Sequence, residues 1–451
     1  MSSQPAAAGP GREEMLRMAQ TILEASRADQ TEVIVFNARG GLTRFANNAI
    51  HQNVHEASVD CSVRAVIGKK IGVAWGNDPS PEALKDLAAR AYELARHAQP
   101  NEEFVSLPSP AGAAGCEVSP VPATVNCGPE QRAESVREMI DIARGQSLSA
   151  AGQVATSDDA FLIANSLGIE AYWAVSNARM RVVMQGADST GFAEAVSDDV
   201  QSLLAREVGS TAASKAVTSA GPKELEPGAY TVILEPLAVE DMVSTLTVYD
   251  MNALAHQEGR SFTSGHLGEK VCGDNITLWD DGCDPRTHRH PYDFEGVVRK
   301  PVTLIENGVL KAVTYDSFTA GREEGAVNTG HALPAPNTWG PVPMNVFLKP
   351  GDYSLEQMIA ETERGVLVTR FHYTNMVHPA RTVLTGMTRD GTFLIENGQI
   401  VGGLKNMRFT QSILEALSHV DMIGSEGVAF DYAWVPPLRI EGFNFSSATA
   451  F

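Results

Sequence analysis

Apolar residues recur at helical spacing near the start of the chain. Residues 13–26 place Met15, Met18, Ile22 and Leu23 on one face, which predicts an amphipathic helix. Apolar and polar positions then alternate over 32–36 and through 42–75, with Gly-containing turns between them, which indicates an antiparallel meander. Helical spacing returns at 81–98. This part of the chain is therefore expected to form a helix, a sheet and a second helix.

A second unit is expected to repeat that order. The stretch 107–121 is rich in Pro, Gly and Ala and predicts a linker. After it we expect a helix at 130–146, strands within 160–185 and a helix at 193–218. Gly and Pro residues then interrupt the pattern, and we place the main boundary near residue 226.

The remaining segment mixes short strands with Gly and Asn turns. We expect a strand at 230–234, a helix at 239–256 and short helices near 354–363 and 410–419. The phrase Leu-Ile-Glu-Asn-Gly occurs at 304–308 and again at 394–398, and its Asn-Gly pair is typical of a tight hairpin.

These patterns predict an α+β fold, with N-terminal helix and antiparallel-sheet units followed by a sheet-rich C-terminal domain. The expected organisation is a disordered tail at 1–12, an N-terminal α/β region of two sub-units at 13–225, with the linker near 107–121, and a mixed β-rich domain at 226–451.

Composition narrows the possible partners. The chain has 451 residues, 43% of them hydrophobic and 20% charged, as in an ordinary globular protein. Its 35 Lys and Arg against 55 Asp and Glu give a net charge of −20, which argues against nucleic acid or an anionic membrane surface as a partner. We see no apolar run of roughly 20 residues for a membrane span and no signal peptide, so a cytoplasmic location is expected. The five Cys are sparse and odd in number, which predicts reduced thiols.

Two groups of residues could be mistaken for metal sites. His51 and His55 stand four apart, but their surroundings alternate like a strand, in which they would lie roughly 13 Å from each other. The loop 283–290 contains a Cys, an Asp and two His, but no fourth ligand stands at a known spacing. We expect surface histidines on a strand in the first case and a solvated loop in the second.

Acidic pairs at 280–282 and 293–296 could hold a cation or act as acid and base. Acidic turns are common in so acidic a chain, so we expect both pairs to be ordinary acidic turns. No phosphate-binding loop, dinucleotide-binding glycine motif or nucleophile elbow occurs in a convincing context.

Two polar segments could line a pocket. One is a polar, aromatic break at 372–378 between strand-like 366–369 and 383–386, and the other is a loop at 329–332 followed by two Pro. Plain surface loops remain an alternative for both. The candidate substrate-binding residues are Thr329, Gly330, His331, His372, Tyr373 and Asn375.

Several blocks of sequence resemble a known family. Phe-Thr-Ser-Gly-His-Leu-Gly-Glu at 262–269, the acidic pairs named above, both Leu-Ile-Glu-Asn-Gly phrases and the run at 379–398 are similar to the C-terminal core of the TldD/PmbA metallopeptidases. The strand at 44–52 and the helix end at 89–98 are similar to its N-terminal part. The resemblance covers nearly the whole chain.

The resemblance fails at the zinc motif. TldD-type members bind zinc through H-E-x-x-x-H on the helix before the Ser-Gly-x-x-Gly-Glu block, together with a Cys near the C-terminus. Counting back from Ser264, that motif would fall on Ser-Thr-Leu-Thr-Val-Tyr at 244–249, and the last Cys is Cys283. None of the three zinc ligands is present at the family's positions, as in the TldE (PmbA) branch.

The resemblance implies a role without a metal or catalytic residue in this chain. We expect a non-catalytic subunit that forms a heterodimer with a TldD-type zinc subunit, encloses unfolded peptide and binds it along a strand edge for proteolysis. No cofactor is expected in this chain, and zinc is expected in the partner. Two alternatives stay open, namely a diverged amidase or peptidase active on its own, for example in a small-molecule biosynthetic pathway, and a binding module with no peptidase partner.

Overall fold

The computed structural model describes residues 9–111 and 115–448. Most of the tail expected at 1–12 therefore lies outside the described residues, and the first helix, α1 (Arg12–Ala25), begins at the end of that range. Among the described residues, no helix combines the length and apolar character that crossing a bilayer requires.

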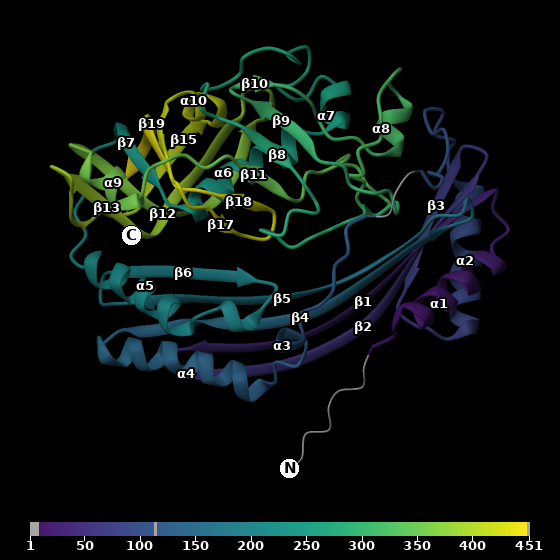
Figure 1. Cartoon of the computed structure of the whole chain (residues 1–451), viewed down its shortest axis with the longest axis horizontal. Helices are drawn as coiled ribbons and strands as arrows, with labels where there is room; N and C mark the ends of the chain where they lie inside the picture. The colour runs from purple at the N-terminus through teal and green to yellow at the C-terminus, as the bar shows by residue number, and fades with distance from the viewer. Residues whose placement is uncertain (1–8, 112–114, 449–451) are drawn as a thin grey trace.

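One antiparallel sheet of six strands makes up the N-terminal half, and it curves beneath the C-terminal half (Figure 1). The two sub-units expected from the sequence are joined in it, because β1 pairs with β4 from Glu32 to Phe45. The strand order is β3-β2-β1-β4-β5-β6. The strands are β1 (Gln30–Ala46), β2 (Ala49–Ile67), β3 (Lys70–Gly76), β4 (Ser149–Asn165), β5 (Glu170–Gln185) and β6 (Thr190–Ser197).

Helices cover the face of this sheet that lies away from the C-terminal half (Figure 1). Val33 and Val35 of β1 pack with α1 and α2 (Pro81–His97), whereas Phe45, on the same face, packs with α4 (Pro129–Gly145) and α5 (Ala205–Thr218). Alternate side chains of a strand share a face, so one strand contributes to both helix layers. Each sub-unit thus repeats one plan of helix, three strands and helix.

The expected helix at 193–218 was wrong in its first part. Residues 190–197 form β6, which pairs with β5, and a short 3-10 turn at Val200–Ser202 precedes α5. In residues 190–197, Thr-Gly-Phe-Ala-Glu-Ala-Val-Ser, apolar and polar positions alternate well enough for an edge strand. Pairing with β5 overrides the helical propensity of the two Ala in this segment. A short helix, α3 (Pro122–Val125), follows the expected linker.

Five strands of the C-terminal half close into a ring, and a smaller six-stranded sheet lies beside it. Around the ring, β12 pairs with β7, β7 with β19, β19 with β15, β15 with β13, and β13 with β12 again. The ring strands are β7 (Gly228–Leu234), β12 (Arg364–His378), β13 (Val383–Glu396), β15 (Met407–Ser412) and β19 (Leu438–Ala448). The smaller sheet contains β8 (Leu278–Asp280), β9 (Val302–Glu306), β10 (Val309–Leu310), β11 (Val346–Leu348), β17 (Val428–Ala429) and β18 (Ala433–Val435).

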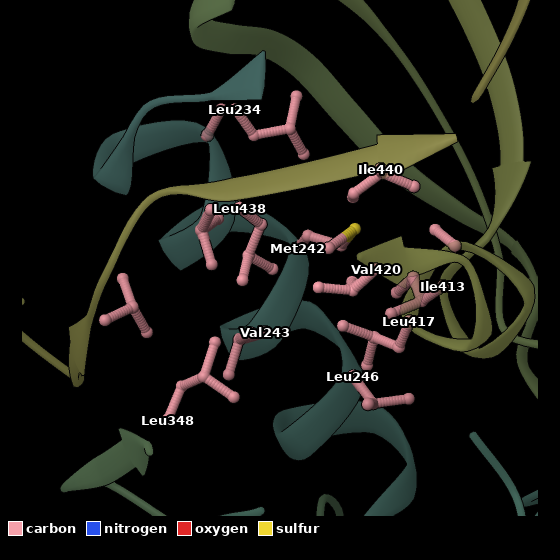
Figure 2. Close-up of a cluster of buried hydrophobic side chains, with 14 of the residues drawn as sticks. Leu234, Met242, Val243, Leu246, Leu348, Ile413, Leu417, Val420, Leu438 and Ile440 are labelled. Carbon is pink, nitrogen blue, oxygen red and sulfur yellow. The ribbon is translucent and has the colours of Figure 1, made fainter. Parts of the chain in front are cut away.

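Helix α6 (Pro236–Asp250) holds these two sheets together. Its buried side chains Met242, Val243 and Leu246 point into the core shared with β19 and with α10 (Ile413–Ser418), as Figure 2 shows. The helix expected at 239–256 is interrupted after Asp250 and resumes as α7 (Ala253–Gln257). The remaining elements are α8 (Ser317–Gly321), α9 (Leu355–Ala360), β14 (Gln399–Gly403) and β16 (Val420–Ile423).

Both expected Asn-Gly hairpins form. Asn307 and Gly308 join β9 to β10 with φ of 48° and 77°, and Asn397 and Gly398 join β13 to β14 with φ of 50° and 74°. Two successive positive φ values are the mark of a type I′ turn. With helices and several sheets in one chain, the α+β fold class is confirmed.

The prediction that all five Cys are reduced is wrong for two of them. Cys116, in the linker, and Cys283, in a C-terminal loop, form a disulfide with their Cα atoms 5.9 Å apart. Cys61, Cys127 and Cys272 are free and buried. Spacing alone could not reveal the bridge, since its two members lie 167 residues apart in the sequence.

Candidate functional site

Helix α6 leaves one stripe of side chains partly open. The helix starts at Pro236, directly after β7, and its opposite face enters the core described above. At its far end Tyr249 meets the half-exposed Trp339 edge to face, with ring centroids 5.5 Å apart. The open stripe, at a spacing of three and four residues, consists of Leu237, Glu240, Asp241, Ser244, Thr245, Val248 and Tyr249.

The beginning of the stripe faces a cavity of about 360 Å³ at the junction of the two halves. A hollow of about 890 Å³ over β1, β2, β4 and β5 shares Arg181 with it. This cavity, called the junction cavity below, therefore lies between the curved sheet, the ring of strands and α6. Its charged lining consists of Arg181 and Glu194 from the sheet, Glu240 and Asp241 from α6, and Arg370 from β12.

The carboxyl groups of this cavity have pKa values above their ordinary ones. Burial raises the pKa of Glu240 to about 7, although the Ser244 hydroxyl donates to its Oε1 at 2.9 Å. Burial also raises the pKa of Asp241, which accepts a hydrogen bond from Thr374 at 2.9 Å, and that of Glu194, which pairs with Arg179 at 3.0 Å. A carboxyl group with a pKa near 7 can exchange a proton at neutral pH or bind a cationic group.

The segment 372–378 is strand and not the break that the sequence suggested. It forms the outer part of β12, where Tyr373 has φ of 51° and the pairing with β13 shifts register. No local sequence pattern predicts that irregularity, which turns Tyr373 outward so that its side chain is 74% exposed. The Tyr373 ring meets the His372 ring edge to face, with the ring centroids 4.4 Å apart. The Asn375 side chain donates to the Tyr373 carbonyl at 3.0 Å. Burial, with Arg389 and Arg370 nearby, lowers the pKa of His372.

The other candidate segment points inward. The Thr329 hydroxyl accepts from the Tyr315 backbone N–H at 2.7 Å, and Gly330, with φ of 76°, packs where a Cβ would lie 2.5 Å from the Val298 carbonyl. His331 is only 2% exposed and bonds through Nε2 to Asp280. The structure thus places His372, Tyr373 and Asn375 on the outer part of β12, where Thr374 contacts α6, but gives Thr329, Gly330 and His331 a packing role at a different place.

The two acidic pairs stand at turns, as expected, but most of their carboxyl groups are buried. Asp280, Asp293 and Glu295 are all buried. Burial, with Glu295 close by, raises the pKa of Asp293 to about 8. Backbone N–H groups of Glu295, Val297 and Ala332 donate to Asp293, so this carboxyl organises a turn from within.

The histidines of the two supposed metal groups have different surroundings. His51 and His55 lie on β2, as expected. His288 is buried between Asp198 and Asn177, and burial together with Arg299 lowers the pKa of His290 to about 3. The histidine end of the loop is therefore not solvated, contrary to expectation, whereas Pro285 and Arg286 are exposed. Within 9–111 and 115–448, no three His, Cys, Asp or Glu side chains are grouped to hold a metal ion.

Comparison with known proteins identifies the family. The model for the PmbA/TldA metallopeptidase C-terminal domain matches residues 227–447, and the model for domain 1 of the same metallopeptidases matches 31–95. Together they span more than half of the chain. The chain therefore belongs to the TldD/PmbA metallopeptidase family.

Individual relatives agree with this assignment. A metalloprotease of Methanothermobacter thermautotrophicus is 28% identical over 50% of this chain and 50% of its own length, and a PmbA homologue of Haemophilus influenzae is 25% identical over 47% and 46%. The match thus spans about half the length of these curated relatives. The crystal structure of TldE from Thermococcus kodakarensis superposes with a TM-score of 0.87 at 22% identity, covering 96% of this chain and 99% of that one, and it shows the same fold.

Sequence reasoning missed the residues that converge on the junction cavity. Glu194, Glu240 and Arg370 come from three distant segments, and only the fold brings them together. The one local signal was the acidic pair Glu240-Asp241 at the start of a helix, where carboxylates are common for reasons of helix stability alone.

Proposed function

We propose that this chain is the metal-free, non-catalytic subunit of a cytoplasmic TldD/TldE-type heterodimer, in which it encloses and binds unfolded peptide for a zinc-bearing TldD-type partner. The observation that carries the proposal is the open stripe of α6. The family's zinc motif would fall on 244–249, and the side chains that the stripe presents there are Ser244, Thr245, Val248 and Tyr249. None of them is a zinc ligand of ordinary proteins.

The outer part of β12 is the proposed peptide-binding edge. On the side opposite β13, β12 pairs with β7 only from Gly365 to Val368, and among the described residues no strand pairs with that side beyond Val368. An extended peptide could add there by main-chain hydrogen bonds, which depend little on its sequence. His372, Tyr373 and Asn375 would be its side-chain neighbours, and the Thr374 contact to Asp241 places α6 alongside.

Reconstitution tests the proposal. The chain alone should contain no stoichiometric zinc by elemental analysis and should not cleave an unfolded peptide, whereas cleavage should appear when a TldD-type subunit is added and stop with a chelator. Replacing Tyr249 with Arg should reduce cleavage by the mixture, and Arg17→Ala on the exposed face of α1 should not. Chelator-insensitive cleavage by the chain alone would contradict the proposal.

Peptide binding is tested separately. Methylation of alternate peptide nitrogens removes the N–H donors that edge pairing needs, so it should weaken binding strongly. His372→Ala should weaken binding only by about 1 kcal/mol, as for one lost hydrogen bond. Loss of binding in His372→Ala, with no effect of N-methylation, would contradict the strand-edge mode.

A second function has one observation in its favour. Glu240, with its pKa raised to about 7 inside a cavity that Arg181 also lines, has the properties of a general acid or base. An amidase or peptidase active without a partner would use it. In that case Glu240→Gln would abolish metal-independent hydrolysis by the purified chain, whereas Glu207→Gln on the exposed side of α5 would not.

A further inference from the structure

A third cavity, of about 520 Å³, lies between β2, β3 and α2 of the N-terminal half and the start of α8 and the loop 332–340 of the C-terminal half. It shares no lining residue with the two hollows described above. Phe104 and Leu254 are buried in its walls, whereas Leu94 is 51% exposed at its edge. Its large apolar lining side chains are Ile71, Val73, Leu94, Phe104, Leu254, Phe318 and Leu333.

The polar part of this cavity is a built and buried network. Arg64 pairs with Glu295 at 3.0 Å and also with Glu32, and it lines the cavity together with Glu295. Ser317 donates to both oxygens of Glu295, from its hydroxyl at 2.6 Å and from its backbone N–H at 3.1 Å. Glu295 and Asp316 are only 4% and 7% exposed. These side chains are held in place before any ligand arrives.

The network is short of positive charge. Three carboxyl groups, Glu32, Glu295 and Asp316, face one guanidinium, Arg64. Burial raises the pKa of Glu32 to about 7, with a further contribution from Glu295, and burial and then Glu295 raise the pKa of Asp316. Burying carboxylates without enough partners is costly, so a cation at this place would be stabilised.

Asp316 has the geometry to receive that cation. Its Oδ1 caps α8, accepting from the Thr319 N–H at 2.8 Å and the Thr319 hydroxyl at 2.7 Å. Among the described residues, none donates a hydrogen bond to its Oδ2. One carboxylate oxygen of a residue that lines the cavity is therefore available to a ligand.

We propose that this cavity binds a primary ammonium group carried on an apolar body, with the ammonium on Asp316 and Glu295 and the body against the apolar walls. An ammonium is compact and offers three donors, which suits a pocket that already contains one guanidinium. An anion would meet the surplus negative charge, and a wholly apolar molecule would leave Asp316 without a partner. The proposal does not depend on the proposed function, because the chain alone forms this cavity.

Binding of n-hexylamine, 1-hexanol and hexanoate to the full chain at pH 7.5 tests the proposal, by calorimetry or ligand-observed NMR. n-Hexylamine should bind saturably, 1-hexanol at least about tenfold more weakly, and hexanoate more weakly still. Asp316→Asn keeps an N-cap acceptor for Thr319 and should weaken n-hexylamine binding at least about tenfold while leaving 1-hexanol unchanged. Leu94→Trp should obstruct the edge of the cavity and weaken both ligands.

Asp86→Asn, on the exposed side of α2, is the matched control and should bind as the original chain does. Thermal unfolding of each variant confirms that it is folded. The proposal is overturned if n-hexylamine does not bind saturably, if 1-hexanol binds equally well, or if Asp316→Asn binds n-hexylamine as the original chain does. Displacement of n-hexylamine by a short lysine peptide would assign the ammonium to a peptide side chain, and binding without such displacement would assign it to a free small amine.

Discussion

His331 donates a buried hydrogen bond from Nε2 to Oδ1 of Asp280, at 2.8 Å. The same oxygen accepts from Arg299 at 2.6 Å, and the other carboxylate oxygen accepts from the Asn345 backbone N–H at 2.8 Å. Burial would raise the pKa of Asp280, but Arg299 and His331 together hold it below its usual range. Burial lowers the pKa of His331 despite the carboxylate beside it.

Replacing Asp280 with Asn should destabilise the protein strongly. The change leaves the buried Arg299 guanidinium without a counter-charge, which typically costs about 3–5 kcal/mol of unfolding free energy. Because the pKa of Asp280 is lower in the folded state than in the unfolded state, its ionised form adds to the free energy of unfolding. That contribution is present at pH values above the unfolded-state pKa near 4 and is lost as pH falls. Urea unfolding should therefore show the largest difference from the original chain at neutral pH. Asp86→Asn, in an exposed pair with Arg90, should change stability by less than about 1 kcal/mol.

Glu240→Gln should stabilise the chain at high pH and have little effect at low pH. The folded pKa of about 7 lies above the unfolded value near 4.5, so the folded state holds the proton more tightly and loses stability as pH rises between these values. Gln keeps an acceptor for Ser244 and carries no such penalty. Urea unfolding should show a gain on the order of 1–3 kcal/mol at pH 8 that shrinks toward pH 5. Equal gains at both pH values would contradict the assigned pKa, and Glu207→Gln should show no such pH dependence.

Gly72→Ala and Gly191→Ala should be damaging in equivalent ways. Gly72 on β3 faces α2, where an added Cβ would lie 2.2 Å from the Ala95 nitrogen, and Gly191 on β6 faces α5, where it would lie 2.1 Å from the Ala212 carbonyl oxygen. The helix backbone cannot move away without opening the core. Each change should therefore lower the free energy of unfolding by about 1–3 kcal/mol or more. Gly76→Ala, on the same strand as Gly72, meets no atom closer than 3.5 Å and is the matched control for thermal unfolding.

Counting free thiols tests the disulfide between Cys116 and Cys283 directly. In denaturant without reductant, thiol labelling should detect three thiols per chain, and five after reduction. The double variant Cys116→Ser, Cys283→Ser should show three thiols in both states and should lose about 2–5 kcal/mol of stability relative to the oxidised chain. Five thiols before reduction, in protein kept from reductants throughout, would contradict the bridge.

The sequence was informative where local physics decides the structure. Periodicity predicted α1, α2 and α4 to within about a residue or two, and the Asn-Gly pairs predicted both type I′ turns, because these elements follow from short-range spacing and backbone preference. It misjudged residues 193–204 because an Ala-rich alternating segment suits both a strand and a helix, and only pairing with β5 decides between them.

The candidate site could be predicted only in part. His372 and Tyr373 lie on the outer part of β12, and the bulge that exposes Tyr373 depends on pairing with β13. His331 was chosen as a polar loop residue, and its burial depends on Asp280, 51 positions earlier in the chain. Polar residues that satisfy one another across such separations look, in sequence, the same as residues that await a ligand.

The ring of five strands has a consequence for how the protein is made. Its first strand, β7, has as one of its two neighbours β19, the last strand of the described residues, so the ring cannot close until β19 has left the ribosome. The N-terminal sheet pairs with no strand beyond β6, and its strands and covering helices are all synthesised by residue 218. During synthesis the completed sheet must therefore wait beside an open ring of at most four strands, whose apolar side chains are not yet covered. A chain truncated before Leu438 would leave β7 and β15 each with an unpaired edge.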